Sequence, residues 1–368
     1  MRRALLLVPA DSEDFLVEEL RALARVASYE IVGEVRLRRR GKSYALTEHK
    51  LAEISSKIEA SGAEVVLCGA ALPPSSILKI ARRVKREVVD RTLLLLEVFE
   101  RNAGSREAKL QIETARLKHM LPLLRESINL LKRGELPGFL SGGTYAADKY
   151  YLHVRKKVSE NYKKLREIAE RRWMLRARRR ELGLPLVAIT GFANAGKTSI
   201  FNALTGSTKE VGPVPFTTLT PKTARGPRLG GERDLSVLFI DTVGFIINVP
   251  PEVVEAFYST LEEVVYSDVL LFVVDSSESL EALSFKIGEA RRILANIGAL
   301  HKPVLVVVNK IDLLNGEDLN VRLQVVREAA SRAFPTLIGV VATSATKSVG
   351  LDFLVRSLWD YLSRSSTC

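Results

Sequence analysis

The residues best placed to do chemistry follow an apolar run at positions 186–190. They read Gly191-Phe-Ala-Asn-Ala-Gly196-Lys197-Thr198, which is the spacing G-x-x-x-x-G-K-[ST] between a strand and a helix. Backbone amides of such a loop, with the helix dipole, hold nucleotide phosphates. We expect Lys197 to bridge the β- and γ-phosphates and Thr198 to bind Mg²⁺. The other predicted nucleotide contacts of this segment are Gly191, Asn194, Ala195, Gly196 and Ser199.

A second motif, Asp241-Thr-Val-Gly244, follows the apolar run LSVLFI. It predicts a carboxylate just outside the direct ligands of the metal and an amide at Gly244 near the γ-phosphate. Between the two motifs lies the polar loop GPVPFTTLTPKT. We predict Thr218 from this loop as a further metal ligand with a catalytic role, together with Lys197 and Gly244. Thr217 is a close competitor that the spacing leaves open.

A third motif selects the base. Asn309-Lys310-Ile311-Asp312 follows the run PVLVVV. A carboxylate at Asp312 accepts hydrogen bonds from the N1 and N2 protons of guanine, which adenine lacks. The Asn309 amide can meet the other edge of the base, and the Lys310 stem can pack on the ring. Ser344 and Ala345, after the run IGVVAT, would close the pocket through a backbone amide. The pattern therefore indicates GTP and GDP as substrate and product.

Phe245 stands directly after Gly244, where many GTP-hydrolysing proteins place a glutamine that orients the attacking water. A phenyl ring cannot orient a water molecule. We therefore expect slow intrinsic hydrolysis that rises when a partner completes the site.

Three segments must position these groups. Apolar runs at 186–190, 236–240, 269–274, 304–308 and 338–341 alternate with helical patterns, which predicts a doubly wound α/β domain over 183–368. Residues 1–104 predict a small α/β domain with a largely parallel sheet, with strands at 4–8, 35–37 and 64–67 and helices at 13–27 and 48–60. Residues 88–96 fit either a strand or a helix. Between the two domains, 105–182 predicts an antiparallel two-helix hairpin.

The hairpin is predicted from apolar seams. Between positions 110 and 131 leucine-type residues recur at spacings of seven, four, three, four and three, and a second stripe runs through 146–182. A Pro/Gly-rich break, ELPGFLSGGTY, separates the two stretches. Pro122, inside the first seam, is expected to bend or interrupt its helix.

The net charge of +12 lies entirely in the front half. Residues 151–183 alone hold 12 Lys/Arg against four Glu. Cations with few opposite charges and with interleaved tyrosine and tryptophan fit an RNA surface as well as a solvated face. The candidate RNA contacts are Lys156, Lys157, Lys163, Lys164, Arg171, Arg172, Arg178 and Arg179.

Composition excludes other classes. Of 368 residues, 46% are hydrophobic and 27% charged, which indicates a globular protein rather than a disordered one. Cys68 and Cys368 offer neither a disulfide framework nor a metal spacing, so a reducing cytoplasm is expected. The short apolar stretch at 4–8 fits a strand better than a signal peptide. No run approaches a membrane span, so membrane contact would be peripheral at most.

The whole chain resembles the HflX family of the Obg-HflX group of P-loop GTPases. The resemblance rests on the switch segments PFTTLTP and DTVGF, on RTLLLLEVF from Arg91, on SREAKLQ from Ser105, and on LPLLR from Leu121. It implies an α/β domain and a helical hairpin before the GTPase domain. It also implies GTP hydrolysis coupled to binding of the large ribosomal subunit and its RNA, in ribosome splitting, rescue or maturation.

One departure from the family pattern stands out. Members commonly carry a longer glycine-rich segment before the second hairpin helix, and here only Pro137-Gly138 and Gly142-Gly143 remain. Two other functions stay open at this point. One is an RNA-binding switch or chaperone driven by GTP binding without significant turnover, and the other places the basic helix on a membrane surface. A monomer is expected.

Overall fold

The computed structural model describes residues 1–40, 43–134, 143–181, 183–208, 222–226, 236–247 and 249–365. Its contacts form two compact units. One comprises Met1–Glu170 with Val249–Phe257, and the other Arg171–Asn248 with Tyr258–Cys368. The three-part division predicted at 104 and 182 stays a prediction, because these contacts do not separate the hairpin from the first domain.

The first unit is built on a parallel four-stranded sheet of order β2-β1-β5-β6. Predicted strands are confirmed, although β2 is longer than expected. An antiparallel pair, β3 and β4, lies outside this sheet. The strands are β1 (Arg2–Pro9), β2 (Tyr29–Leu37), β3 (Arg39–Arg40), β4 (Ser43–Tyr44), β5 (Val65–Cys68) and β6 (Glu87–Val89).

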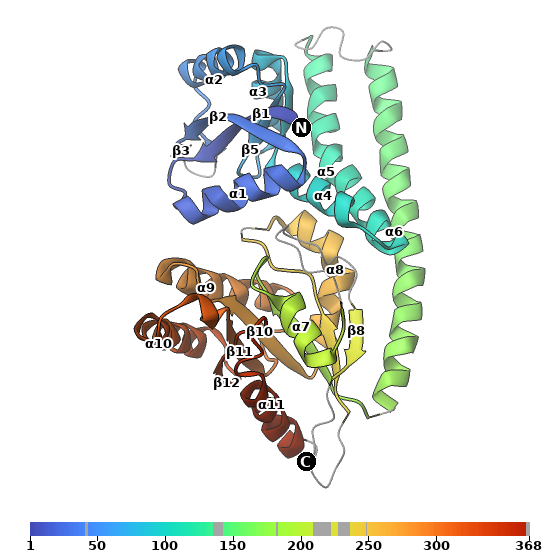
Figure 1. The fold of residues 1–368 in the computed structure, drawn as a ribbon. Coiled ribbons are helices and arrows are strands. Elements are labelled where there is room, and N and C mark those ends of the chain that lie inside the picture. The colour runs from blue at the N-terminus through green and yellow to red at the C-terminus, as the bar shows by residue number, and fades with distance from the viewer. Residues whose placement is uncertain are drawn as a thin grey trace. The chain divides into compact units, whose positions relative to one another are not determined.

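Helices cover both faces of this sheet (Figure 1). Side chains of α2 and α3 share a buried cluster with Leu5, Leu7 and Val66, while α1 and α4 contact the sheet and each other elsewhere. Both expected helices are confirmed, and α3 is an addition. The helices are α1 (Asp14–Val26), α2 (Glu48–Ser61), α3 (Pro74–Val84) and α4 (Arg91–Asn102).

Segment 88–96, which fitted either a strand or a helix, contains both. Strand β6 ends at Val89, and the Asp90 side chain then accepts a hydrogen bond from the Leu93 amide at 3.0 Å. Such a cap satisfies an amide that the first helical turn leaves unpaired. The chain therefore changes from strand to helix at one residue.

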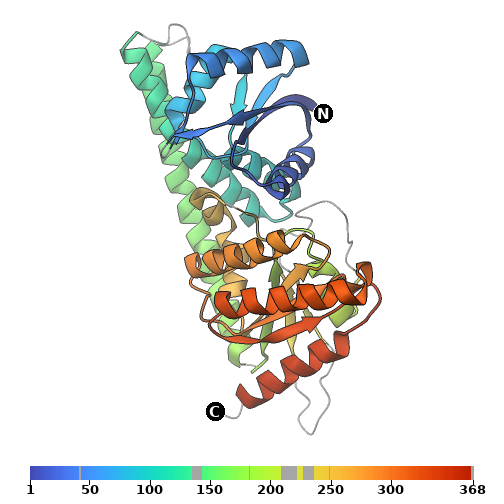
Figure 2. The same cartoon turned by 90° about the vertical axis from the view of Figure 1, so that its left-hand side faces the viewer.

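The predicted antiparallel hairpin is confirmed by α5 (Arg106–Lys132) and α6 (Gly143–Glu181), which lie side by side in Figures 1 and 2. Lys157 pairs with Glu113 at 2.7 Å, and Lys132 with Asp148 at 3.6 Å, so the two helices run in opposite directions. Pro122 does not interrupt α5. Packing on one side of a long helix outweighs the single backbone hydrogen bond that proline cannot donate.

The second unit contains a six-stranded sheet of order β12-β11-β10-β7-β9-β8. All five predicted strands are confirmed, and only the short antiparallel edge strand β8 was not expected. The strands are β7 (Leu186–Gly191), β8 (Lys222–Arg225), β9 (Leu238–Asp241), β10 (Val269–Asp275), β11 (Val304–Asn309) and β12 (Leu337–Ala342).

Helices again lie on both sides of the sheet. Leucines of α11 and Ile200 and Phe201 of α7 pack in one buried cluster with β7, β10 and β11, while α9 and α10 lie side by side over the sheet in Figure 2. The helices are α7 (Lys197–Thr205), α8 (Pro251–Tyr266), α9 (Leu280–Asn296), the 3₁₀ helix η1 (Ile311–Leu313), α10 (Gly316–Ala333) and α11 (Leu351–Ser365). The first part of α8, up to Phe257, is grouped with the first unit.

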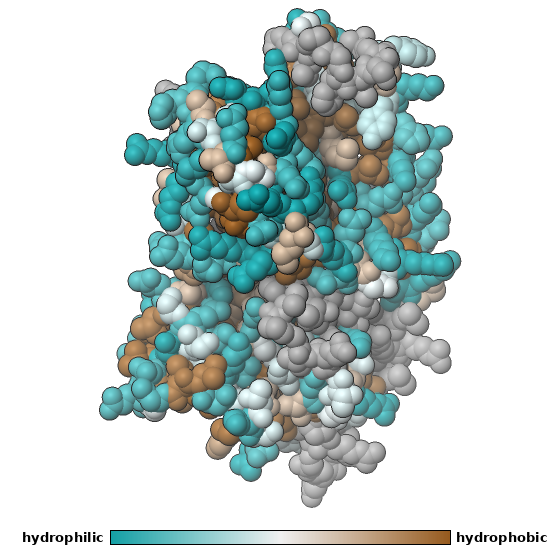
Figure 3. Space-filling model, turned by 45° about the horizontal axis from the view of Figure 1, so that its top comes forward, coloured by the Kyte–Doolittle hydropathy of each residue, from teal (hydrophilic) through white to brown (hydrophobic). Residues whose placement is uncertain are grey.

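The surface seen in Figure 3 is mostly hydrophilic, with hydrophobic side chains scattered over it. Among the described helices, none combines the length and the apolar character that crossing a bilayer requires.

Candidate functional site

The residues predicted to contact a nucleotide gather at the carboxyl edge of the six-stranded sheet. Strands β11, β10, β7 and β9 are parallel neighbours in that order. They end in Asn309, Asp275, Gly191 and Asp241 respectively. Ligands of open α/β sheets bind outside this edge. The fold therefore brings the separate sequence motifs to one place.

The loop from Gly191 to Gly196 requires both glycines. Gly191 has φ +140°, and a Cβ there would overlap the Val273 carbonyl oxygen; Gly196 has φ +90°, and a Cβ would overlap the Asn309 amide nitrogen. Helix α7 begins directly after Gly196 without a side-chain cap. The amino end of α7 therefore lies at the loop, where the motif predicts that backbone amides bind phosphate oxygens.

Lys197 is 8% exposed, and its amine donates a hydrogen bond to the Phe192 carbonyl oxygen at 2.7 Å. A Cβ added at Gly244 would lie 2.8 Å from the Lys197 Nζ. The structure therefore brings Lys197 and Gly244, both predicted to act on the terminal phosphates, next to each other. The absence of a side chain at residue 244 leaves room for the ammonium group.

Thr198 and Asp241, the predicted metal-site residues, are also adjacent. The Thr198 hydroxyl donates to Asp241 Oδ2 at 3.0 Å, and the Asp241 carboxylate is fully buried. The next residue, Thr242, fixes the segment because its hydroxyl donates to the Ile189 carbonyl oxygen at 2.8 Å. A hydroxyl and a carboxylate oxygen at this distance form the kind of hard-oxygen site that a divalent cation prefers.

Phe245 points into the protein core. Its ring is 4% exposed and meets the Phe192 ring edge-on, with 5.9 Å between centroids. Its backbone is clamped to the phosphate loop, since its amide donates to Gly191 at 2.9 Å and its carbonyl accepts from Ala193 at 3.2 Å. The residue that replaces a water-orienting glutamine thus serves as an anchor between the two motifs.

Asn309 links the phosphate loop to the base loop. Its Nδ2 donates to the Ala195 carbonyl oxygen at 3.1 Å, and its Oδ1 accepts from the Ala345 amide at 3.1 Å. The side chain is 2% exposed. We expected the Asn309 amide to meet an edge of the base and a backbone amide of Ser344 or Ala345 to close the pocket. In this structure both the nitrogen and the oxygen of the Asn309 side-chain amide are hydrogen-bonded to protein groups. The Ser344 backbone amide donates to the Val349 carbonyl oxygen at 2.9 Å.

Asp312, the predicted guanine reader, is exposed at its position in η1. One carboxylate oxygen accepts a hydrogen bond from the buried Ser344 hydroxyl, which also accepts from the Lys347 amide at 3.2 Å. The contact orients the carboxylate and leaves it open to solvent. This arrangement is suited to a group that accepts protons from a base.

Sequence reasoning missed Asp275. Its Oδ2 lies 2.6 Å from the Lys310 ammonium, and the carboxylate is 7% exposed at the end of β10. A signal was present, because an acidic residue that ends a buried apolar strand lies at the same edge as the other motifs. Thr218 and its competitor Thr217 lie outside the described residues, so the choice between them stays open.

Comparisons with known proteins match GTP-binding proteins along nearly the whole chain. Family models match consecutively: "GTP-binding GTPase N-terminal" over residues 15–100, "GTP-binding GTPase Middle Region" over 102–179, and "50S ribosome-binding GTPase" over 186–310. The GTPase HflX of Hyperthermus butylicus is 42% identical over 99% of this chain and 98% of its own length. That of Saccharolobus solfataricus is 35% identical over 96% and 97%.

The chain belongs to the HflX family of GTPases. The family resemblance inferred from the motifs is thereby confirmed. As a member of this family, the protein binds guanine nucleotides and hydrolyses GTP.

Solved structures support the fold. The crystal structure of the SsGBP and GDP complex superposes on this chain with a TM-score of 0.54 and is 31% identical to it in sequence, and the match covers all of both chains. A GTP-binding protein from Sulfolobus solfataricus in complex with GDP has a TM-score of 0.52 and 31% identity, covering 99% of each. The predicted fold class is therefore confirmed.

The cations proposed for RNA contact in this HflX family member differ in their surroundings. Lys157 and Arg172 are in ion pairs, the latter with Glu262 at 3.2 Å. Lys156 is 3.9 Å from Glu160. By contrast, Lys163, Lys164 and Arg171 are exposed and have no carboxylate partner among the described residues. The side chains of Arg178 and Arg179 lie outside the described part of the chain.

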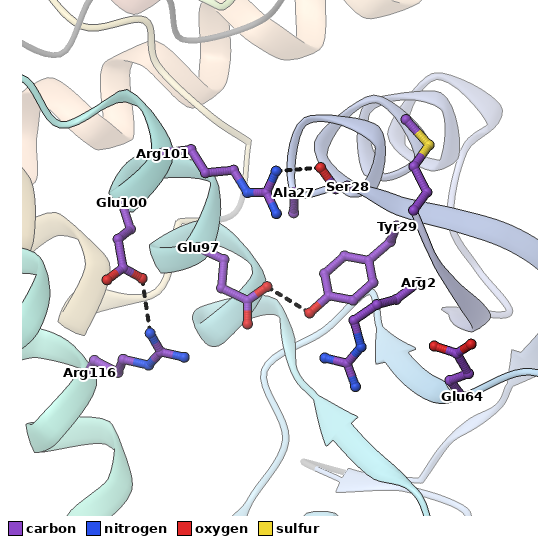
Figure 4. Close-up of a pocket in the computed structure, with 10 residues that line it drawn as sticks. Arg2, Ala27, Ser28, Tyr29, Glu64, Glu97, Glu100, Arg101 and Arg116 are labelled. Atoms are coloured by element: carbon purple, nitrogen blue, oxygen red, sulfur yellow. Dashed lines mark hydrogen bonds and ion pairs between the residues drawn. The ribbon is translucent and has the colours of Figure 1, made fainter.

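A separate cavity of about 800 Å³ lies in the first unit, at the amino ends of β1 and β2 and beside α4 and α5 (Figure 4). Its polar groups mostly pair with one another. The Tyr29 hydroxyl donates to Glu97 at 2.8 Å, and Arg116 pairs with Glu100 at 2.9 Å. Burial is the main cause that raises the pKa of Glu97. None of the described phosphate-binding or base-reading residues lines this cavity, so we do not assign it to nucleotide chemistry.

Proposed function

We propose that this GTPase is a switch that binds the large ribosomal subunit and its RNA, and that helix α6 provides the RNA contacts. The observation that carries the proposal is the exposed stretch containing Lys163, Lys164 and Arg171. Exposed cations gain affinity by displacing counterions from phosphates. Tyr162 and Trp173, which are 38% and 64% exposed, lie beside them and could stack on bases.

The family supports the ribosomal partner at a general level. The model that matches residues 186–310 is described as a 50S ribosome-binding GTPase. The cytoplasm is the compartment that this partner implies.

We retain 1–104, 105–182 and 183–368 as the proposed domain boundaries and a monomer as the proposed state.

We propose Mg²⁺ as the metal. The fit rests on the oxygen atoms of Thr198 and Asp241, 3.0 Å apart, one of them from a fully buried carboxylate. Among the described residues no group of three or more His, Cys, Asp or Glu could hold a metal. Mg²⁺ suits such a site because it binds with few protein ligands together with phosphates and water. Thr198 would hold the ion, Thr218 would join it, and Asp241 would lie just outside the direct ligands. Bound there, the ion would neutralise phosphate charge.

We further propose that hydrolysis is slow until the ribosome completes the site. Phe245 offers no group that could orient water, and its ring is buried edge-on against the ring of Phe192. Lys197 would stabilise charge on the transferred phosphate, and the Gly244 amide would face it. In this role Lys197 would exchange its hydrogen bond to the Phe192 carbonyl oxygen for one to a phosphate oxygen.

Sedimentation with separated ribosomal subunits tests the proposal. The protein is loaded with GDP or with a non-hydrolysable GTP analogue, and each state is measured over a range of salt concentrations. We expect comigration with the large subunit in the GTP-like state, weakening as salt rises. Equal or absent comigration in both states would contradict the proposal. GTP turnover measured with and without large subunits tests the slow intrinsic rate independently.

A further inference from the structure

Asp275 carries a carboxylate whose direction is fixed by its own turn. Oδ1 accepts hydrogen bonds from the Ser277 amide at 2.9 Å and from the Ser277 hydroxyl at 2.6 Å. Side chains of this type commonly bind the backbone two residues further on. The remaining oxygen, Oδ2, therefore has a defined position before any other group approaches.

That oxygen holds Lys310. The Lys310 ammonium lies 2.6 Å from Asp275 Oδ2, and the lysine side chain is 32% exposed. Asp275 pairs in register with Asn309, the residue before Lys310. Lys310 itself has φ +67°, a left-handed backbone. The ion pair and this turn together hold the Lys310 ammonium at the end of β10, at the edge of the sheet where the base-reading motif lies.

A free lysine side chain samples many rotamers, and ordering it on binding lowers affinity. A tethered stem avoids most of this loss. We infer that Asp275 is a positioning residue that holds Lys310 as one wall of the base pocket. Asp275 thereby strengthens the packing of the Lys310 stem on the face of the guanine ring. The discrimination between guanine and adenine stays with Asp312, which contacts the edge of the base. The inference rests on the placement of Lys310 in the base pocket.

The test is a double-mutant cycle with Asp275→Asn and Lys310→Ala. Asparagine keeps an oxygen for the Ser277 amide, so the turn persists while the ion pair is lost. Calorimetry gives the dissociation constants of GDP and of inosine diphosphate, which lacks the 2-amino group. We expect each single variant to bind both nucleotides roughly tenfold more weakly, by the same factor. The double variant should lose no more than either single one.

Glu289→Gln is the matched control. Glu289 is 9% exposed and pairs with Arg292 at 3.3 Å on α9, outside the base site. It should bind GDP like the wild type. Thermal unfolding without nucleotide shows whether each variant is folded.

The outcomes separate two failures. Unchanged GDP affinity in Lys310→Ala would overturn the placement of Lys310 in the base pocket, and the inference with it. Weak binding by Lys310→Ala with wild-type binding by Asp275→Asn would overturn the inference alone. Unequal factors for the two nucleotides would also overturn it, because Asp275 would then act on the edge of the base.

Discussion

Two neighbouring lysine pairs on α6 offer a matched test of RNA binding. Lys163 and Lys164 are exposed without a carboxylate partner in the described structure. Lys157 is held by Glu113 at 2.7 Å, and Lys156 lies 3.9 Å from Glu160. We compare Lys163→Gln/Lys164→Gln with Lys156→Gln/Lys157→Gln. Both double variants remove the same charge from the same helix.

The magnitude follows from counterion release. Each phosphate contact contributes about 0.7 to 0.9 to the slope of log affinity against log salt. If both exposed lysines contact phosphates, their removal lowers the slope by about 1.4 to 1.8. The paired lysines should lower it by less than about 1, since Lys157 must leave Glu113 to reach a phosphate.

The assay measures binding of the GTP-like state to large subunits, or to a fragment of their RNA, at several salt concentrations. Circular dichroism confirms that both variants keep their helix content. Equal slopes for the two variants would refute the reasoning, because pairing would then not decide which lysines bind RNA. A slope unchanged from the wild type in Lys163→Gln/Lys164→Gln would refute the contact itself.

Three further predictions concern single residues. Gly196→Ala should weaken GDP binding at least tenfold by calorimetry, because alanine in a left-handed conformation costs about 1–2 kcal/mol and its Cβ would displace the Asn309 side-chain amide. The control is Gly298→Ala, which also has a positive φ (+76°) but has nothing within 4 Å of the added Cβ, and it should bind GDP normally. Phe245→Gln should lower the free energy of unfolding by about 2–4 kcal/mol without faster hydrolysis, and a large rise in turnover would contradict its role as an anchor. Glu97→Gln should remove part of the pH dependence of stability. Since the folded-state pKa of Glu97 is raised, its carboxyl favours folding at low pH, and this contribution is lost as pH rises from about 4.5 towards the raised value; an unchanged pH profile of thermal unfolding would refute this.

The sequence predicted the GTPase domain well because its signals are local. A buried parallel strand reads as a continuous apolar run, and each run here ends in a polar motif. The register of β10 with β11 then places those motifs together without further information. The same reasoning found the hairpin, whose seams depend only on helical periodicity.

Other features depend on partners that are distant in the sequence. Lys310 alone indicates a base contact, but its ion pair requires the position of Asp275 on another strand. Arg172 was predicted as an RNA contact together with its basic neighbours, but its guanidinium forms an ion pair with Glu262 on α8. Strand β8 is short and pairs only at the edge of the sheet, so it leaves no periodic pattern in the sequence.

Helix α3 was missed although it carries a local signal, namely a proline at its start and Ile77, Ile80 and Val84 at helical spacing.

The double attachment of Asn309 has a consequence for how the nucleotide leaves. One amide group ties the cradle of the phosphates to the loop beside the base. We therefore expect that disturbing either end loosens the other, and that the two halves of the ligand are released together rather than one after the other. A partner that accelerates exchange would need to pull on only one of these loops to empty the pocket.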